Sequence, residues 1–536
     1  MSENTIFWKI FTKRALISFF TMMLLFLSCI LRVAVTAAAG FNEEQLQRNC
    51  YKLNIGNLRG TIYDCNMVPI TNNNQKIIAA VSPTQRAITG ISSLLEGDEL
   101  ENVLSILKKG EPAVCEIPKD IKCDGIVTTK IYENSGSFTP AIHLIGYTDS
   151  ENKGVSGIEA AYDDLLYSKK RVTVYFESDG KGRILEGAEA VIENDTNVTA
   201  SGVVTTLDIN IQNIAEKAAE NIECGAVIVA EANTGKIRAM VSRPFFDCEN
   251  INSYLNREDS PLLNRAICAY NVGSVFKPCV AAVGIENGIS NFEYTCTGSY
   301  EILDRLFKCH ERNGHGFINL SSALAFSCNT FFYNFAQKIT GEKIYNMASS
   351  LSFGQSIKLC DGIYTAKGSL QSKESLNNPA MLANFAIGQG KLTLSPVSML
   401  TLYCAIASDG TYYLPSVVES TVNNGKTTLY DYGEKTRVMN SETAKKLREH
   451  LTKVITEGTG TDACPTTVTA AGKTATAQTG KYENGAEISQ GWFCGFFPAE
   501  EPKYVVIVFS ENTKKQIKTS NKIFAEIADN ITALNN

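Results

Sequence analysis

The sequence predicts an α+β fold in which helices cover an antiparallel sheet. Two strand runs, 225–231 and 236–242, are joined by Asn233-Thr234-Gly235, a turn sequence typical of a hairpin. A helix-rich stretch follows from about Leu262 to Ser408 before strand patterns return. A sheet drawn from both ends of a domain, with a helical insertion between its strands, is an α+β sandwich.

The N-terminus carries a long apolar run. Ala15 to Leu31 is uncharged and follows three basic residues, Lys9, Lys13 and Arg14, while small apolar residues continue to Ala39. The run is at the short end of what spans a bilayer and is longer than the usual core of a signal peptide. We therefore expect a membrane anchor.

Basic residues next to a membrane span remain on its cytoplasmic side. We therefore expect a cytoplasmic tail at 1–14, a transmembrane anchor at 15–39 and the rest of the chain outside the cell membrane. A cleaved signal peptide is the alternative, since Thr36-Ala37-Ala38-Ala39 could serve a signal peptidase. Both readings export the rest of the chain. The net charge of -6 gives no reason to expect nucleic acid as a partner.

The region from 40 to 200 mixes strand-like runs with polar loops, and nothing in it predicts a reaction centre. It opens with a strand and turn at 59–64, continues with a helix around Ser92–Lys109 and has a short helix over 156–166. We interpret it as a spacer or docking domain. The region from 201 to 536 forms the second domain.

The second domain begins with a helix that Asp208 caps and that runs through Ala219, with apolar residues spaced for one face. After the hairpin and the helix-rich middle, strands are expected at 472–478, 490–497 and 504–510. A last helix is expected over Asn521–Leu534.

The clearest indication of a catalytic site is the segment Gly273-Ser274-Val275-Phe276-Lys277. The glycine permits a tight turn, and a helix after it would put Ser274 and Lys277 on one face. A serine hydroxyl needs a neighbour that accepts its proton, and a lysine forced into its neutral state can do so. Taken alone, a serine and a lysine at this spacing are more often polar surface residues of a helix with no catalytic role.

A second motif is Ser327-Cys328-Asn329. Residues two apart do not share a helical face, so both outer side chains can enter one site only if the tripeptide lies in a turn. Helical patterns on both sides, 323–326 and 330–338, favour a loop between two helices. A helix N-cap explains the tripeptide equally well.

The third motif is Gly472-Lys473-Thr474-Ala475-Thr476, in an expected strand. Lys473 can supply a second cation, and the hydroxyls of Thr474 and Thr476 can bind a carboxylate. The strand edge offers hydrogen bonds to an extended peptide. Taken singly, this is only a polar strand.

The three motifs together indicate a function more strongly than any one of them alone, because of their order and separation. They lie 53 and then 146 residues apart, a set typical of penicillin-binding proteins and class A β-lactamases. Beyond the anchor the chain resembles a class B penicillin-binding protein, a peptidoglycan D,D-transpeptidase, over nearly its whole length. Six further segments carry the resemblance: Arg59-Gly60 with Asp64, 154–159, 206–208 with Gln212, 234–240, 263–266 and 491–493.

The resemblance implies a non-catalytic pedestal domain followed by a transpeptidase domain of the serine β-lactamase type. It implies that Ser274 is the acylated nucleophile and Lys277 its base. Ser327 and Asn329 map onto the family's second motif, Lys473 and Thr474 onto its third, and the N–H groups of Ser274 and Thr476 onto its oxyanion hole.

The resemblance also implies partners. They are the stem peptides of peptidoglycan, β-lactams that bind covalently, the membrane and a glycosyltransferase of the wall-synthesis machinery. No cofactor is implied. Whether the chain serves elongation, division or spore formation stays open, as does the acceptor amine.

Ala475 departs from the family, whose third motif reads Lys-Thr-Gly. A methyl group takes up room that glycine leaves for the ligand. An active enzyme remains the better reading because Thr476, Ala477 and Gln478 continue the family pattern. We expect Ala475 to reduce β-lactam affinity and Ala475→Gly to speed acylation.

Cys296, Cys309 and His315 form a second, loose cluster. A disulfide or free thiols explains it most simply. A zinc site would need a compact pair of ligands, which this spacing lacks, so we expect no metal.

Two alternatives to a transpeptidase remain. Water in place of the acceptor amine would make the chain a D,D-carboxypeptidase or a β-lactamase-like hydrolase, although the anchor and pedestal argue against a β-lactamase. A non-catalytic scaffold of cell-wall synthesis is favoured only by Ala475.

Overall fold

A computed structural model describes residues 3–38, 50–133, 139–179, 181–185, 187, 190–193, 201–431, 433, 435–483, 486–511 and 517–534. It consists of two compact units. The first comprises Met1–Gly56, Lys76–Ile131 and Arg171–Asn194, and the second Asn57–Gln75, Tyr132–Lys170 and Asp195–Asn536. The expected boundary residues 39, 40 and 200 lie outside the described residues.

The first unit begins with helix α1 (Glu3–Ala38). Within it, Trp8–Val35 is long and apolar enough to cross a membrane, and none of its most apolar stretch is buried by the protein. Residues 15–38 of the expected anchor thus fall on one continuous helix that also contains Lys9, Lys13 and Arg14.

The remainder of the first unit contains two small sheets. One has the order β4-β3-β5 (Ala113–Ile117, Asn74–Val81, Ile126–Glu133), and the other β1-β6-β7 (Cys50–Arg59, Tyr167–Glu177, Val191–Glu193). Helices α3 (Gln85–Ser92) and α4 (Gly97–Leu107) share an apolar core with the first sheet. The helix expected over 92–109 therefore starts later, because Ser93 caps α3 and α4 begins only at Gly97.

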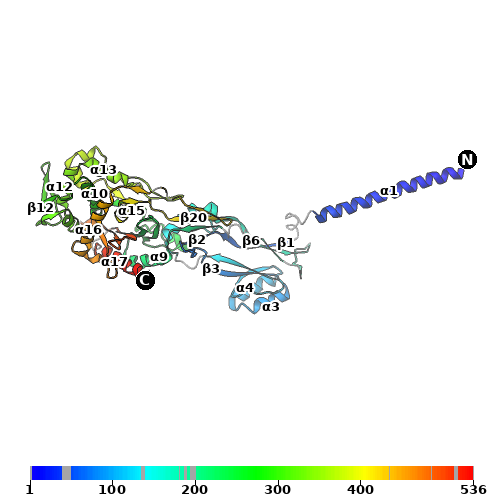
Figure 1. The fold of residues 1–536 in the computed structure, drawn as a ribbon. Coiled ribbons are helices and arrows are strands. Elements are labelled where there is room, and N and C mark those ends of the chain that lie inside the picture. Colours follow the sequence, from blue (N-terminus) through cyan, green and yellow to red (C-terminus); the bar gives the residue numbers. More distant parts are fainter. Residues whose placement is uncertain are drawn as a thin grey trace. The chain divides into compact units, whose positions relative to one another are not determined.

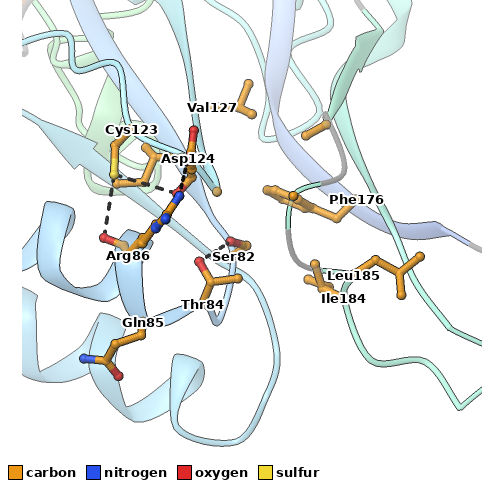
Figure 2. A pocket seen from close by; sticks show the side chains of 14 residues that line it. Ser82, Thr84, Gln85, Arg86, Cys123, Asp124, Val127, Phe176, Ile184 and Leu185 are labelled. Carbon is orange, nitrogen blue, oxygen red and sulfur yellow. Dashed lines mark hydrogen bonds and ion pairs between the residues drawn. The ribbon is translucent and has the colours of Figure 1, made fainter.

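A cavity of about 700 Å³ lies within the first unit (Figure 2). Its lining combines polar residues, among them Ser82, Thr84 and Arg86, with the apolar side chains of Phe176 and Ile184. None of the three motif segments contributes to it.

The second unit, in which Figure 1 labels α9, α15 and α17 among other elements, is built around a five-stranded antiparallel sheet. The order of its strands is β10-β9-β25-β24-β23. The strands are β9 (Gly225–Glu231), β10 (Ile237–Arg243), β23 (Ala471–Glu483), β24 (Ala486–Phe497) and β25 (Tyr504–Ser510). Strands from both ends of the domain thus lie in one sheet, and the α+β prediction is confirmed.

The central strands alternate between two buried faces. Val227 and Val229 pack with α9 (Ile209–Ala218) and α17 (Ile517–Leu534), while Ile228 belongs to the core on the other side. That larger core contains α15 (Pro396–Ala407), in which every residue is buried. Burial on both faces explains why these strands are apolar throughout.

The helical insertion lies between β10 and β23 in the chain. Its helices are η3 (Gly273–Phe276), α10 (Lys277–Glu286), α11 (Leu320–Ala325), α12 (Asn329–Ile339), α13 (Gly341–Ser350), α14 (Pro379–Ala386), α15 and α16 (Ser441–Thr456). Two short hairpin-like sheets accompany them, β12-β15 (Glu293–Cys296, Gly316–Asn319) and β13-β14 (Ser299–Ile302, Arg305–Lys308).

A four-stranded sheet, β2-β8-β20-β21, completes the second unit (Thr61–Tyr63, Gly202–Thr205, Val418–Asn423, Lys426–Leu429). Because β2 pairs with β8, residues 57–75 group with the later part of the chain and not with the first unit. The smaller elements are α5 (Ile142–Ile145), α6 (Gly157–Ala161), α7 (Asp163–Leu166), η1 (Ala219–Asn221), η2 (Cys248–Ser253), β11 (Tyr270–Asn271), β16 (Lys358–Cys360), β17 (Ile363–Tyr364), η4 (Ser375–Asn377), β18 (Thr393–Leu394), β19 (Thr411–Tyr412), β22 (Thr436–Arg437) and η5 (Thr461–Ala463).

Candidate active site

Ser274 lies in the tight turn η3, directly before α10, and is half-buried. Gly273 has φ +62°, and a Cβ on it would lie 3.2 Å from the Cα of Ala477. Glycine is therefore needed both for the backbone conformation and for the close approach of the turn to β23. The N–H of Gly273 donates to the carbonyl of Gly388 at 3.0 Å, which fixes the turn from its other side.

Lys277 is the first residue of α10 and is completely buried. Its ammonium group donates to the carbonyl of Ser327 at 2.6 Å, to Oδ1 of Asn329 at 2.7 Å and to Oγ of Ser327 at 3.3 Å. Burial lowers the pKa of Lys277 to about 8. A substantial neutral fraction is then present near neutral pH, as a general base requires.

Ser327 and Cys328 lie in the predicted turn between α11 and α12, and Asn329 is the first residue of α12. Ser327 has φ +55°, a conformation that a residue with a Cβ rarely adopts, and its neighbour Cys328 donates its N–H to the carbonyl of Ala323 at 2.9 Å. Cys328 is the N-cap of α12, so the N-cap alternative holds for the central residue of the tripeptide. Ser327 and Asn329 are thereby turned toward Lys277.

The third motif lies on β23, the outer strand of the five-stranded sheet. Lys473 is completely buried, and its ammonium group donates to the carbonyl of Thr474 at 3.0 Å. The pKa of Lys473 lies well below its usual value, mainly because of burial and further because of the charge of Lys277. The two amines therefore interact electrostatically.

The side chains after Lys473 alternate along the strand. Ala475 is 3% exposed and belongs to the core face that also contains Ala477, whereas Thr476 is exposed. Thr474 is buried, and its hydroxyl hydrogen-bonds to that of Thr459 at 2.8 Å. The methyl group of Ala475 thus points into the protein on the side of Lys473, not outward along the open edge.

The structure brings most of the predicted residues together. Lys277, Ser327 and Asn329 are in direct contact, and Lys473 lies within electrostatic reach of Lys277. In the described part of the chain, the hydroxyl of Ser274 makes no hydrogen bond to either lysine. Its position is set by the turn that packs on β23.

Sequence reasoning missed Asn271, which ties the turn of Ser274 to the sheet. Its side-chain amide donates to the carbonyl of Gln478 at 2.8 Å, its N–H donates to Oε1 of Gln490 at 3.1 Å, and its carbonyl accepts from Nε1 of Trp492 at 2.9 Å. Its place just before the Gly-Ser turn was the only available signal.

It also missed Cys328 as a member of the cysteine cluster. The sulfur atoms of Cys296, Cys309 and Cys328 and a ring nitrogen of His315 all lie within 4.8 Å of one another.

Comparison with known proteins places the second unit in a family. A family model described as "Penicillin binding protein transpeptidase domain" matches residues 225–531. Stage V sporulation protein D of Bacillus subtilis is 29% identical over 514 residues, which cover 88% of this chain and 77% of that protein. Peptidoglycan D,D-transpeptidase MrdA of Acinetobacter baumannii is 26% identical, over 72% of this chain and 63% of that protein.

Solved structures share the fold. The D,D-transpeptidase domain of a peptidoglycan glycosyltransferase from Eggerthella lenta superposes with a TM-score of 0.65 at 24% identity, covering 90% of this chain and 99% of that one. Penicillin-binding protein 3 of Mycobacterium tuberculosis, in complex with aztreonam, gives 0.65 at 22% identity, covering 90% and 97%. Penicillin-binding protein 2 of Helicobacter pylori, solved in complex with MreC, gives 0.64 at 22% identity, covering 90% and 99%.

Proposed function

The chain belongs to the penicillin-binding protein transpeptidase family, and from that premise we propose that it is a peptidoglycan D,D-transpeptidase acting through Ser274. The observation that carries the proposal is the environment of Lys277: a buried amine, held by Ser327 and Asn329, one helical turn after Ser274. Two curated relatives bear the name peptidoglycan D,D-transpeptidase MrdA, and others carry related names.

In the first step, Oγ of Ser274 attacks the carbonyl carbon of the D-Ala–D-Ala peptide bond. Neutral Lys277 accepts the hydroxyl proton, and the bond to the terminal D-Ala breaks. That D-Ala leaves as a free amine after receiving a proton relayed through the hydroxyl of Ser327, and an ester on Ser274 remains. The N–H groups of Ser274 and Thr476 are proposed to stabilise the oxyanion.

In the second step, an amine from a neighbouring stem peptide attacks the ester carbonyl. The new amide bond forms, the amine gives up a proton through the same groups, and Oγ of Ser274 is released as a hydroxyl. Atoms and charge balance without a cofactor.

The substrate peptide is proposed to lie along β23. This strand is the outer one of its sheet, so an extended peptide can pair with its free edge. The exposed Thr476 and the charge of Lys473 suit the terminal carboxylate of the donor. β-Lactams, which resemble the D-Ala–D-Ala unit and open to an ester, are proposed to acylate the same serine.

The remainder of the chain is proposed to place this site at the cell wall. Helix α1 would anchor the protein as a single pass, with Lys9, Lys13 and Arg14 cytoplasmic and the domains from residue 40 onward outside. Residues 40–200 are proposed as the pedestal and 201–536 as the transpeptidase domain. A glycosyltransferase of the wall-synthesis machinery is the proposed partner, as the family resemblance implies, and the relative from Helicobacter pylori was solved with a different protein, MreC.

The test is an exchange assay with the full chain in detergent, a donor peptide ending in D-Ala–D-Ala and labelled D-amino acid as acceptor. A transpeptidase releases D-Ala and incorporates the label. Release of D-Ala without incorporation would make the protein a carboxypeptidase, and neither reaction would favour a scaffold. Ser349→Ala, a half-buried serine on α13, is the control for Ser274→Ala.

A further inference from the structure

Four potential metal ligands converge beside the second motif. Cys296 ends β12, Cys309 follows β14, His315 precedes β15 and Cys328 caps α12. The three cysteines are buried and His315 is half-buried. The sequence predicted no metal because it offers only the first three residues, at irregular spacing; the fold supplies Cys328 as the fourth.

Three of the six distances within this Cys₃His cluster are close to those expected around a zinc ion, and all six are within 4.8 Å. Nδ1 of His315 lies 3.5 Å from Sγ of Cys296 and 3.6 Å from Sγ of Cys309, and the sulfurs of Cys309 and Cys328 are 3.9 Å apart. A tetrahedral site with Zn–S bonds of about 2.3 Å and a Zn–N bond of about 2.05 Å has edges of roughly 3.8 Å between sulfurs and roughly 3.6 Å between sulfur and nitrogen.

Hydrogen-bond donors point at the sulfurs from the protein side. The hydroxyl of Thr330 donates to Sγ of Cys296 at 3.0 Å, and the N–H of Phe331 donates to Sγ of Cys328 at 3.5 Å. Such donors orient and stabilise metal-bound thiolates. The half-exposed His315 leaves a route by which an ion can enter.

Two glycines allow the ligand loops to meet. Gly298 has φ +89°, and a Cβ on it would lie 2.1 Å from the carbonyl oxygen of Arg312; Gly314 has φ +80°, and a Cβ on it would lie 2.1 Å from the carbonyl oxygen of Cys296. The backbone after Cys296 and the backbone before His315 therefore cross at a distance that only glycine permits.

We propose that Cys296, Cys309, His315 and Cys328 bind a zinc ion that holds the Ser327-Cys328-Asn329 turn in place. Cys328 lies between the two residues that accept hydrogen bonds from Lys277. Ser327 is also in a strained backbone conformation that its surroundings must maintain. A metal bond to Cys328 would anchor this turn to β12 and to the loop that carries Cys309 and His315. The positioning effect rests on the proposed function, whereas the binding of zinc does not.

The first experiment measures metal directly. The full chain, purified in detergent under anaerobic conditions and loaded with Zn²⁺, should retain about one zinc ion per chain after removal of free metal. Replacing zinc with Co²⁺ should give the intense near-ultraviolet bands of thiolate-to-cobalt charge transfer and the visible bands of a tetrahedral site. His315→Ala should lose the metal, whereas His450→Ala, a half-buried histidine on α16 outside the cluster, should keep it.

The second experiment asks what the metal does. Removing zinc with a chelator should slow acylation by a fluorescent penicillin by about 10- to 100-fold, and adding Zn²⁺ back should restore it. Cys464→Ser, an exposed cysteine outside the cluster, should leave both zinc content and acylation unchanged.

The proposal fails if the anaerobic, metal-loaded wild-type chain carries no zinc and gives no cobalt spectrum. It also fails if mass spectrometry finds a Cys309–Cys328 disulfide that metal loading in the presence of reductant does not replace. Zinc bound without any effect on acylation would overturn the positioning role. Because metal content is read without substrate, these results are independent of whether the chain is a transpeptidase.

Discussion

At the scale of single residues, the site depends on two fully buried lysines, Lys277 and Lys473, that lie within electrostatic reach of each other. Removing an ammonium group from water is costly, and a second cation nearby adds repulsion. Within the described part of the chain, Lys473 donates only to the carbonyl of Thr474, whereas Lys277 donates to three acceptors. Both pKa values are lowered, so the pair shares its protons, and the hydroxyl of Ser274 gains a neighbour that can accept one.

The first prediction concerns Lys277. Arginine keeps the charge but cannot lose its proton, so Lys277→Arg should slow acylation by a β-lactam by about 10²- to 10⁴-fold. Lys338→Arg, an exposed lysine on α12, should have no effect. Acylation rates near the wild-type value in Lys277→Arg would exclude Lys277 as the base.

The wild-type rate should also depend on pH in a defined direction. The active form is the neutral amine, so the rate should increase as pH rises and level off above about 8, the pKa of Lys277. Burial lowers the pKa of this amine, whereas the thiols of Cys328 and Cys309 raise it. A rate that falls over the same range would contradict this assignment.

A further prediction concerns Ala475. Its methyl group is buried on the core face of β23 that also contains Ala477. Glycine at this position leaves more room for a ligand to approach the strand, so Ala475→Gly should speed acylation by about two- to fivefold. It should also lower stability slightly, since glycine weakens a strand. Stopped-flow acylation and thermal melts measure the two effects, and an unchanged acylation rate would show that the methyl does not restrict the ligand.

At the scale of elements, the sequence predicted where the chemistry lies but not how it is supported. The turn between α11 and α12 followed from the spacing of Ser327 and Asn329, and the strand of Lys473 from its composition. The contacts of Asn271 with β23 and β24 could not be predicted, because they join positions more than 200 residues apart. The cluster of Cys296, Cys309, His315 and Cys328 was missed for a different reason: its spacing in the sequence is irregular, and only the fold brings Cys328 to the other three.

The packing of η3 against β23 gives a prediction at this scale. Gly273→Ala introduces both an unfavourable φ and a contact with Ala477, so it should destabilise the protein by about 1–2 kcal/mol and slow acylation. Gly288→Ala is the matched control, because Gly288 has φ +76° but open space around it. Gly288→Ala should lower the stability without slowing acylation. If both variants were acylated at the same rate, the close approach of the turn to β23 would be unimportant.

At the scale of the whole molecule, the strands and helices of the second unit were largely predictable, but the division of the chain was not. The strand expected at 504–510 matches β25, because a buried strand leaves a clear apolar pattern. Residues 57–75 and 132–170 were expected in the first domain, yet they group with the second unit. The local sequence has no pattern that indicates that these two segments pack with the second unit.

An ion pair joins the segments 57–75 and 132–170. Removing it tests whether the contact between them stabilises the second unit. The buried Arg59 pairs with Glu159, with its Nε donating to Oε2, and with Asp163, whose Oδ1 lies 2.8 Å from Nη1. Glu159→Gln leaves part of the Arg59 charge unpaired and should destabilise the fold by about 3 kcal/mol, measured by urea unfolding. Asp361→Asn, in the exposed pair with Lys358, should leave the midpoint unchanged. If Glu159→Gln left the midpoint of urea unfolding unchanged, this ion pair would not stabilise the unit.

The most direct test of the account is the site of covalent modification by penicillin. The full chain in detergent is incubated with a labelled penicillin, digested, and the modified peptide is sequenced by mass spectrometry. The label should be found on Ser274 alone, and Ser274→Ala should remain unlabelled while retaining the wild-type melting temperature. A stable adduct on another residue, or labelling that persists in folded Ser274→Ala, would contradict the claim that this hydroxyl is the nucleophile.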